Sequence, residues 1–284
     1  MIESRNPASR QEGPIGVFDS GVGGLSILRE IQRQLPGESV LYLADQANVP
    51  YGSQSLQLVR SYARGITSFL LDQGAKLIVV ACNTASAASL QILRSEFPTI
   101  PFVGMEPAVK PAAETTRSKV VGVLATPATF QGELYASVVE RFTAGVRILP
   151  STLPGLVKQI EAGNLEGDHT RLILERAIQP LLEEGADTLV LACTHYPLVM
   201  PLIQEIAGPS VQVIDPSPAI ARQTGRLLEQ HELNADAEDN GVIRYLTSGS
   251  VEQLQRQLES FRMQPGTASA VHWEGDKLVF NPAG

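Results

Sequence analysis

The sequence contains only two cysteines, Cys82 and Cys193, among its 284 residues. Two cysteines can form at most one disulfide bond, which excludes a small secreted domain held together by a disulfide framework. Together with His195 they form neither a CxxC pair nor a four-ligand zinc motif, so we expect no metal site. The presence of the two cysteines therefore needs an explanation other than a disulfide framework or a metal site.

Positive charge and long apolar runs are also scarce. Lysine and arginine number 22 against 30 acidic residues, for a net charge of −8, which argues against nucleic acid as a partner. No apolar run approaches the roughly 20 residues that span a bilayer, and residues 1–13 lack the apolar core of a signal peptide. We expect a cytoplasmic protein without a membrane partner, whose thiols stay reduced.

The glycine pattern of a dinucleotide-binding loop is missing as well. Gly21 and Gly23 follow the apolar run at 15–18, but Ser26 stands where the third glycine belongs. Asp19 would also repel a pyrophosphate, so nucleotide binding is not expected. Asp19 and Ser20 lie between a predicted strand and a predicted helix, where they can either cap the helix or contact a ligand.

Short apolar runs alternate with longer amphipathic segments along most of the chain. Predicted strands lie at 15–18, 39–45, 76–81, 101–105, 119–125, 147–150, 187–192 and 211–215. Predicted helices include 24–35, 56–73, 133–142 and 169–185. Runs of Val, Ile and Leu are typical of strands that are covered on both faces. The alternation predicts an α/β fold of mainly parallel sheets flanked by helices.

A weak internal repeat indicates two similar lobes. The spacing from GVFD at Gly16 to GVLA at Gly122 nearly equals the spacing from Cys82 to Cys193. Any α/β protein repeats strand, turn and helix, so this evidence leaves a single domain open. The similar spacings favour two pseudo-symmetric lobes with an active site in the cleft between them. We expect residues 1–104 with 213–284 to form the first lobe and residues 105–212 the second.

The ends of the chain are expected to play a lesser part. Residues 1–13 form an N-terminal tail, and the composition turns polar after residue 235. A strand-like segment at 242–248, a helix-like segment at 251–261 and the single tryptophan, Trp273, follow. We expect this C-terminal extension to pack on the first lobe, and it contains no recognisable catalytic motif.

Both cysteines occupy the same local setting. Cys82 follows Leu-Ile-Val-Val-Ala and Cys193 follows Leu-Val-Leu-Ala, and each precedes two polar residues. Ligands of parallel α/β sheets bind at such strand ends, and the N-terminus of the next helix favours a thiolate. We therefore expect cysteine pKa values below ~8.5. Inert buried thiols or a disulfide bond remain alternatives, but a matched pair favours a catalytic role.

Two further stretches have little meaning in isolation. The turn Pro50-Tyr51-Gly52 leads into a helix, and glycine and proline are common in any turn. Glu161 ends an amphipathic segment, where a solvated surface carboxylate is the ordinary expectation.

Together these motifs resemble the glutamate racemases of the cofactor-independent Asp/Glu racemase family. The resemblance covers roughly residues 14–230. The matching segments are Asp19-Ser20-Gly21, Gly23-Gly24-Leu25, Pro50-Tyr51-Gly52, residues 81–86 (ACNTAS), residues 192–197 (ACTHYP) and Asp215-Pro216-Ser217.

The resemblance implies a reaction and a set of roles. Cys82 would act on D-glutamate and Cys193 on L-glutamate, without a cofactor, to supply D-glutamate for peptidoglycan synthesis. Asp19 would assist Cys82, and His195 with Glu161 would assist Cys193. The family further implies a homodimer. Substrate-binding roles would fall to the residues Asp19, Ser20, Tyr51, Gly52, Asn83, Thr84, Thr194 and His195.

Two alternatives remain at this point. Aspartate racemases resemble the chain in fold and in the paired cysteines, but they carry histidine at the position of Ser86, which favours glutamate. A two-lobed protein that binds an amino acid without turnover is the alternative from another functional class.

Overall fold

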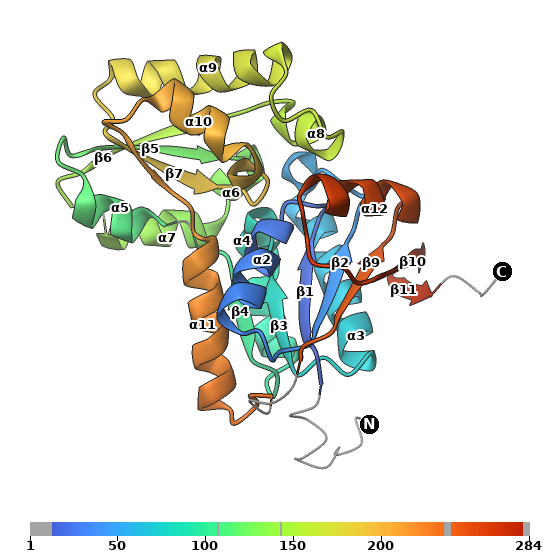
Figure 1. Ribbon diagram of the computed structural model, residues 1–284. Helices are drawn as coiled ribbons and strands as arrows, with labels where there is room; N and C mark the ends of the chain where they lie inside the picture. Colours follow the sequence, from blue (N-terminus) through green and yellow to red (C-terminus); the bar gives the residue numbers. More distant parts are fainter. Residues whose placement is uncertain (1–12, 107, 143, 236–239, 281–284) are drawn as a thin grey trace.

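The computed structural model describes residues 13–106, 108–142, 144–235 and 240–280. Two sheets are formed, one of seven and one of four strands (Figure 1). Among the described strands every pairing is parallel except that of the two last strands. The expected α/β class with mainly parallel sheets is confirmed. The N-terminal tail predicted at 1–13 lies almost entirely outside the described residues.

The first sheet brings strands from both halves of the sequence together. Its spatial order is β11 (Lys277–Phe280), β10 (Thr267–Glu274), β9 (Ile243–Thr247), β2 (Val40–Ala44), β1 (Ile15–Asp19), β3 (Leu77–Val80) and β4 (Phe102–Gly104). The central strands β1, β2 and β3 are completely buried. Continuous Val, Ile and Leu runs produce this burial because helices cover both faces of the sheet.

The second sheet repeats the arrangement on a smaller scale. Its order is β6 (Arg147–Thr152), β5 (Val120–Ala125), β7 (Thr188–Ala192) and β8 (Gln212–Ile214). The strands β5 and β7 pair in register, so that Ala125 lies beside Ala192. We propose that the two sheets are the cores of the two lobes expected from the sequence, with the first limit at residue 104 as predicted. The predicted limit at 212 falls inside β8, whose Val213 and Ile214 pair with β7, so the second limit lies after residue 214.

Amphipathic helices cover the sheets. In the first part of the chain they are α2 (Leu25–Gln34), the 3-10 turn η1 (Tyr51–Ser53), α3 (Leu56–Asp72) and α4 (Asn83–Glu96). Between β4 and β8 lie α5 (Val109–Thr115), α6 (Pro127–Phe130), α7 (Glu133–Phe142), α8 (Leu156–Glu161), α9 (Asp168–Glu183), the 3-10 turn η2 (Tyr196–Val199) and α10 (Met200–Ala207). The last two are α11 (Ser217–Gln230) and α12 (Val251–Ser260). In Figure 1 the α9 and α10 helices lie on one face of the smaller sheet, and α5 and α7 lie on the other.

The C-terminal extension is part of the first sheet. Strand β9 pairs with β2 over five residues, from Val40–Ile243 to Ala44–Thr247, and β10 and β11 continue the sheet outward. The α12 helix lies at the end of this sheet that faces the second lobe (Figure 1). Strand β9 of the extension therefore ends level with the carboxyl end of β1, where Asp19 lies. Of the helices in the described ranges, none is both long and apolar enough to cross a membrane.

Candidate active site

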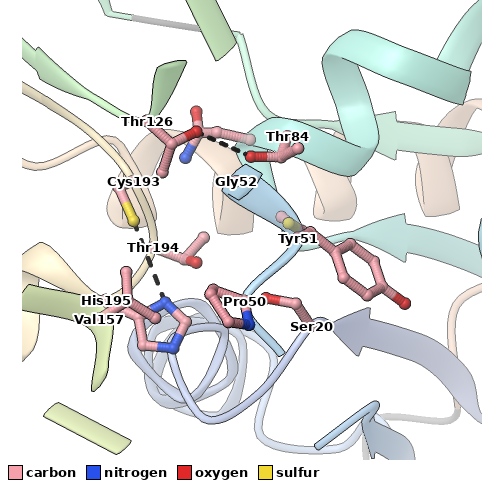
Figure 2. Close-up of a pocket in the computed structure, with 12 residues that line it drawn as sticks. Ser20, Pro50, Tyr51, Gly52, Thr84, Thr126, Val157, Cys193, Thr194 and His195 are labelled. Atoms are coloured by element: carbon pink, nitrogen blue, oxygen red, sulfur yellow. Dashed lines mark hydrogen bonds between the residues drawn. The ribbon is translucent and has the colours of Figure 1, made fainter. Parts of the chain in front are cut away.

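A narrow cavity lies where the strand ends of the two sheets meet. Its lining comes from both lobes: Ser20, Pro50, Tyr51, Gly52, Cys82, Asn83 and Thr84 from the first, and Thr126, Val157, Cys193, Thr194 and His195 from the second (Figure 2). The free volume between these side chains is about 20 Å³, which is on the order of one or two water molecules. Both cysteines thus contribute to one cavity.

Cys82 lies between β3 and α4, as the sequence predicts. It is the N-cap residue of α4, and its sulfur accepts a hydrogen bond from the backbone N–H of Ala85 at 3.5 Å. The expected lowering of its pKa is wrong. Burial and the negative charge of Asp19 raise the pKa of the Cys82 thiol well above its ordinary value, and outweigh the helix N-terminus.

Asp19 ends β1 beside Cys82, where it hydrogen-bonds the start of α2; it is fully buried and is not among the residues that line the cavity. Its Oδ2 accepts a hydrogen bond from the N–H of Gly24, the N-cap of α2, at 2.8 Å, and another from the Thr194 hydroxyl at 3.3 Å. Its Oδ1 is buried without a partner among the described residues. Burial raises the pKa of Asp19, although the positive charge of His195 opposes this shift. A carboxyl of raised pKa next to a thiol can accept and return a proton.

Cys193 has a different set of neighbours. Its sulfur lies 4.0 Å from Nδ1 of His195, and Nε2 of His195 lies 2.7 Å from Oε1 of Glu161. Burial alone would lower the pKa of His195, but its contacts with Cys193 and Glu161 raise that pKa well above the ordinary value. An imidazolium donates from both ring nitrogens, so His195 can hydrogen-bond Glu161 and the sulfur together.

Glu161 is not the solvated carboxylate expected from its sequence context. Only 8% of its surface is exposed, and Oε1 accepts a hydrogen bond from the N–H of Val22 at 2.8 Å. Burial would raise the pKa of the carboxyl, but the hydrogen bonds from His195, Val22 and Gln46 lower it overall. Glu161 and His195 therefore form a buried ion pair within the second lobe, and the hydrogen bond from Val22 ties it to the first.

Of the residues expected to bind a substrate, all except Asp19 line the cavity. Ser20, Gly52, Thr84 and Thr194 are all present in the lining. Tyr51 also contributes to it, but its hydroxyl points away from Cys193 (Figure 2) and donates to Oδ2 of the buried Asp45 at 2.6 Å. Its ring and backbone, rather than its hydroxyl, are available to a ligand.

The side chain of Asn83 has unused hydrogen-bonding capacity. Its Oδ1 and Nδ2 are both buried and have no partner among the described residues. An unpaired buried amide costs free energy, so its retention at a cavity wall indicates a polar ligand. Ser86, in contrast, does not line the cavity. Its hydroxyl donates to the Val80 carbonyl at 2.9 Å and accepts from the Met105 N–H at 2.8 Å.

Three lining residues were not expected from the sequence. Pro50 was recognisable only as part of a turn, and neither Thr126 nor Val157 belongs to a motif. Thr126 hydrogen-bonds Thr84 across the cleft at 3.0 Å (Figure 2). The internal repeat contained a signal for Thr126, because it follows Gly122 at the same spacing as Ser20 follows Gly16.

The comparisons with known proteins agree with this geometry. A family model described as Asp/Glu/Hydantoin racemase matches residues 15–224. A glutamate racemase of Ectopseudomonas mendocina is 51% identical over 247 residues, 87% of this chain and 94% of that protein. The crystal structure of a Bacillus anthracis glutamate racemase has a TM-score of 0.82 at 32% identity and covers 92% of this chain and 98% of its own. A Francisella tularensis glutamate racemase in complex with D-glutamate gives a TM-score of 0.81 at 28% identity, with the same coverage.

Proposed function

The chain belongs to the Asp/Glu/hydantoin racemase family, and from this premise we propose that it interconverts L- and D-glutamate. The observation that supports this proposal most strongly is the placement of two thiols from two strand ends at one cavity. A racemase removes the α-proton from one face of the substrate and delivers a proton to the other face. Two acid–base groups from opposite sides of a cleft meet that requirement.

The proposed reaction needs no cofactor. With D-glutamate bound, the Cys82 thiolate takes the Cα proton, and the electron pair of the C–H bond passes to the planar carbanion. The Cys193 thiol then gives its proton to the opposite face, which leaves L-glutamate, a Cys82 thiol and a Cys193 thiolate. The reverse reaction exchanges the two roles. Positioned donors, rather than an electron sink, must lower the barrier.

The neighbours of the two sulfurs support different auxiliary roles. Asp19, whose pKa is raised, lies where it can accept the proton of the Cys82 thiol. The imidazolium of His195 faces the sulfur of Cys193 and can stabilise its thiolate. The ammonium group of a bound substrate would add positive charge, and this charge would favour the Cys82 thiolate.

The lining residues are suited to an amino-acid dicarboxylate. Asn83 offers an unpaired amide, and the hydroxyls of Ser20 and Thr84 can donate to carboxylates. The N-terminus of α4 adds backbone N–H groups that favour an anion. The inner cavity has a free volume of only about 20 Å³, but a pocket of about 580 Å³ shares Pro50, Gly52, Thr126 and Val157 with it and offers further room for a substrate.

The cellular setting belongs to the same proposal. We place the enzyme in the cytoplasm as a homodimer, where it supplies D-glutamate for peptidoglycan synthesis. Its partner is then a small-molecule substrate, and neither nucleic acid nor a membrane is required. The net charge of −8 agrees with the absence of a nucleic-acid partner.

Deuterium exchange at Cα tests the proposal directly. The protein is incubated with L- or D-glutamate in deuterated buffer without added cofactor, and incorporation and optical rotation are measured. Wild type should incorporate solvent deuterium and lose optical rotation from both enantiomers. The Cys82→Ala and Cys193→Ala variants should each lose racemisation about 10³-fold or more in both directions, because each removes one acid–base group.

The same assay separates the alternatives. Faster exchange and racemisation of aspartate than of glutamate would identify an aspartate racemase. A binding protein that does not turn over would incorporate no deuterium. Substantial racemisation by either cysteine variant, with unchanged thermal unfolding, would exclude the two-thiol scheme.

A further inference from the structure

The α12 helix of the C-terminal extension directs a buried glutamine at Glu161. Gln257 is only 5% exposed. Its Nε2 donates to the backbone carbonyl of Glu161 at 2.7 Å and lies 3.4 Å from Oε2 of the same residue. Its Oε1 accepts from Nε2 of Gln46 at 2.8 Å, and that nitrogen also lies 3.2 Å from Oε2 of Glu161. Two side-chain amides therefore converge on one carboxylate.

The direction of this hydrogen-bond chain is fixed at Glu161, because its carboxylate and carbonyl oxygens can only accept from Gln257 and Gln46. The hydroxyl of Thr247 accepts from the N–H of Gly249 at 2.9 Å and donates to Oε1 of Gln46 at 2.8 Å. With its oxygen engaged there, Gln46 can only present its NH₂ group to Gln257 and Glu161. Gln257 must then accept with its oxygen and donate with its nitrogen. Both amides consequently donate toward Glu161.

These donors complete the surroundings of the carboxylate. Oε1 of Glu161 faces Val22 and His195, whereas Oε2 faces Gln46 and Gln257. Glu161 is also the last residue of α8, so its carbonyl has no partner within the helix. Gln257 donates to that carbonyl and fixes the backbone as well as the side chain. A carboxylate held at both oxygens keeps one orientation toward the imidazole.

We propose that Gln257, together with Gln46, is a positioning residue that holds Glu161 against His195 and thereby orients the acid–base group at Cys193. This inference rests on the proposed function and gives the C-terminal extension a part in it. Gln257 acts through Glu161 and touches neither the cavity nor a sulfur in the described contacts. Thr247 and Gln257 both come from the extension, which the sequence had left without a catalytic role.

The charges around the Glu161 carboxylate determine the expected pH effect. His195 hydrogen-bonds it, and the electrostatic neighbours of this pair are Asp19, Cys193 and Tyr42. The amide donors stabilise the ionised form of Glu161, so their removal raises its pKa. Since the ionised carboxylate supports the imidazolium, the acidic limb of the kcat/KM profile should move to higher pH.

The test compares Gln257→Met with Gln255→Met, an exposed position on the same helix. We expect Gln257→Met to shift the acidic limb upward by about one pH unit, as loss of a hydrogen bond to a charged group implies. We further expect kcat/KM to fall about tenfold at neutral pH. The Gln255→Met variant should match wild type in both measurements.

Isotope effects locate the defect within the reaction. With C2-deuterated substrates, impaired proton transfer at Cys193 should raise the isotope effect on kcat/KM for L-glutamate relative to that for D-glutamate. A general loss of stability would leave this ratio unchanged. An unchanged ratio and an unshifted acidic limb in Gln257→Met would overturn the proposal.

A measurement without turnover keeps this inference separate from the proposed function. In ¹⁵N spectra of the histidine rings, the His195 signals should shift in Gln257→Met and stay unchanged in Gln255→Met. If wild type racemises no glutamate, the proposed function fails, and these spectra alone decide whether Gln257 positions the pair. If Gln257→Met does not fold, Gln257→Glu replaces it. The added carboxylate should move the acidic limb further upward through repulsion with Glu161.

Discussion

Each of the two thiols has its own chemical environment, although the sequence around them is nearly the same. The carboxyl of Asp19 lies beside Cys82, whereas the imidazole of His195 faces Cys193. A neighbouring negative charge disfavours a thiolate, and a neighbouring positive charge stabilises it. The free enzyme should therefore hold Cys82 as the thiol. This asymmetry suits a reaction that needs one proton donor and one acceptor at its start.

The Cys193→Ala variant isolates the titration of Cys82, because no other thiol remains in the sequence. The pKa of Cys82 is raised in the folded protein, so thiolate absorbance in the ultraviolet should rise only above the ordinary thiol pKa of about 8.5. Unfolding in denaturant should bring the midpoint back to about that ordinary value. Stability should fall as the pH rises through this range, because the unfolded thiol loses its proton first. A midpoint in the folded variant at or below that of the unfolded variant would contradict the surroundings described for Cys82.

At the scale of elements, the turn between β1 and α2 connects the two halves of the site. A Cβ atom at Gly21 would collide with the carboxylate of Glu161. One at Gly23 would collide with the His195 ring and would lie 2.7 Å from the His195 backbone nitrogen. The glycines that resemble a nucleotide loop are therefore needed for the close approach of the other lobe. No phosphate is required to explain them.

Gly23→Ala tests this packing. The added methyl group must displace His195 or its loop, so kcat/KM should fall about 100-fold, because small misplacements of catalytic groups have large kinetic effects. Gly167→Ala provides the control, since a Cβ there meets nothing within 4 Å and the backbone φ is −69°. Steady-state racemisation rates of both variants measure the effect of the added methyl group on kcat/KM. Equal activity would show that the lobes do not depend on this contact.

At the scale of the whole molecule, the C-terminal extension hydrogen-bonds residues that lie next to the lining of the substrate cavity. Trp273 on β10 donates from Nε1 to Oδ1 of Asp45 at 2.8 Å, and Ser248 donates to the same oxygen. The other oxygen of Asp45 accepts from Tyr51, which lines the cavity. The extension thus fixes the turn that contains Tyr51 and, through Gln257, also fixes Glu161.

Replacing the single tryptophan measures the contribution of this support. Trp273→Phe keeps an aromatic ring but removes the donor to a buried carboxylate, which should lower the free energy of unfolding by about 2 kcal/mol. Denaturant unfolding followed by circular dichroism gives this value. Ser269→Ala, at an exposed position of the same strand, should stay within about 0.5 kcal/mol of wild type. A Trp273→Phe protein as stable as this control would show that the indole hydrogen bond is dispensable.

Local pattern was sufficient to predict the fold class and most elements. The apolar runs at 15–18 and 187–192 became β1 and β7 with boundaries shifted by one residue, because burial on both faces demands continuous Val, Ile and Leu. The short helix α5 was not predicted, since seven residues show too little periodicity. The antiparallel hairpin of β10 and β11 was not predicted either.

The sequence by itself determined that two matched cysteines follow buried strands of an α/β fold, because strand burial and helix starts are local properties. Only the tertiary structure decided what surrounds each sulfur. Burial and Asp19 raised the pKa of Cys82 against the local expectation, because desolvation and the charge of a neighbouring strand outweigh a helix N-terminus. Glu161, Gln46 and Gln257 come together from three distant segments, and no local pattern specifies contacts between residues so far apart in the chain.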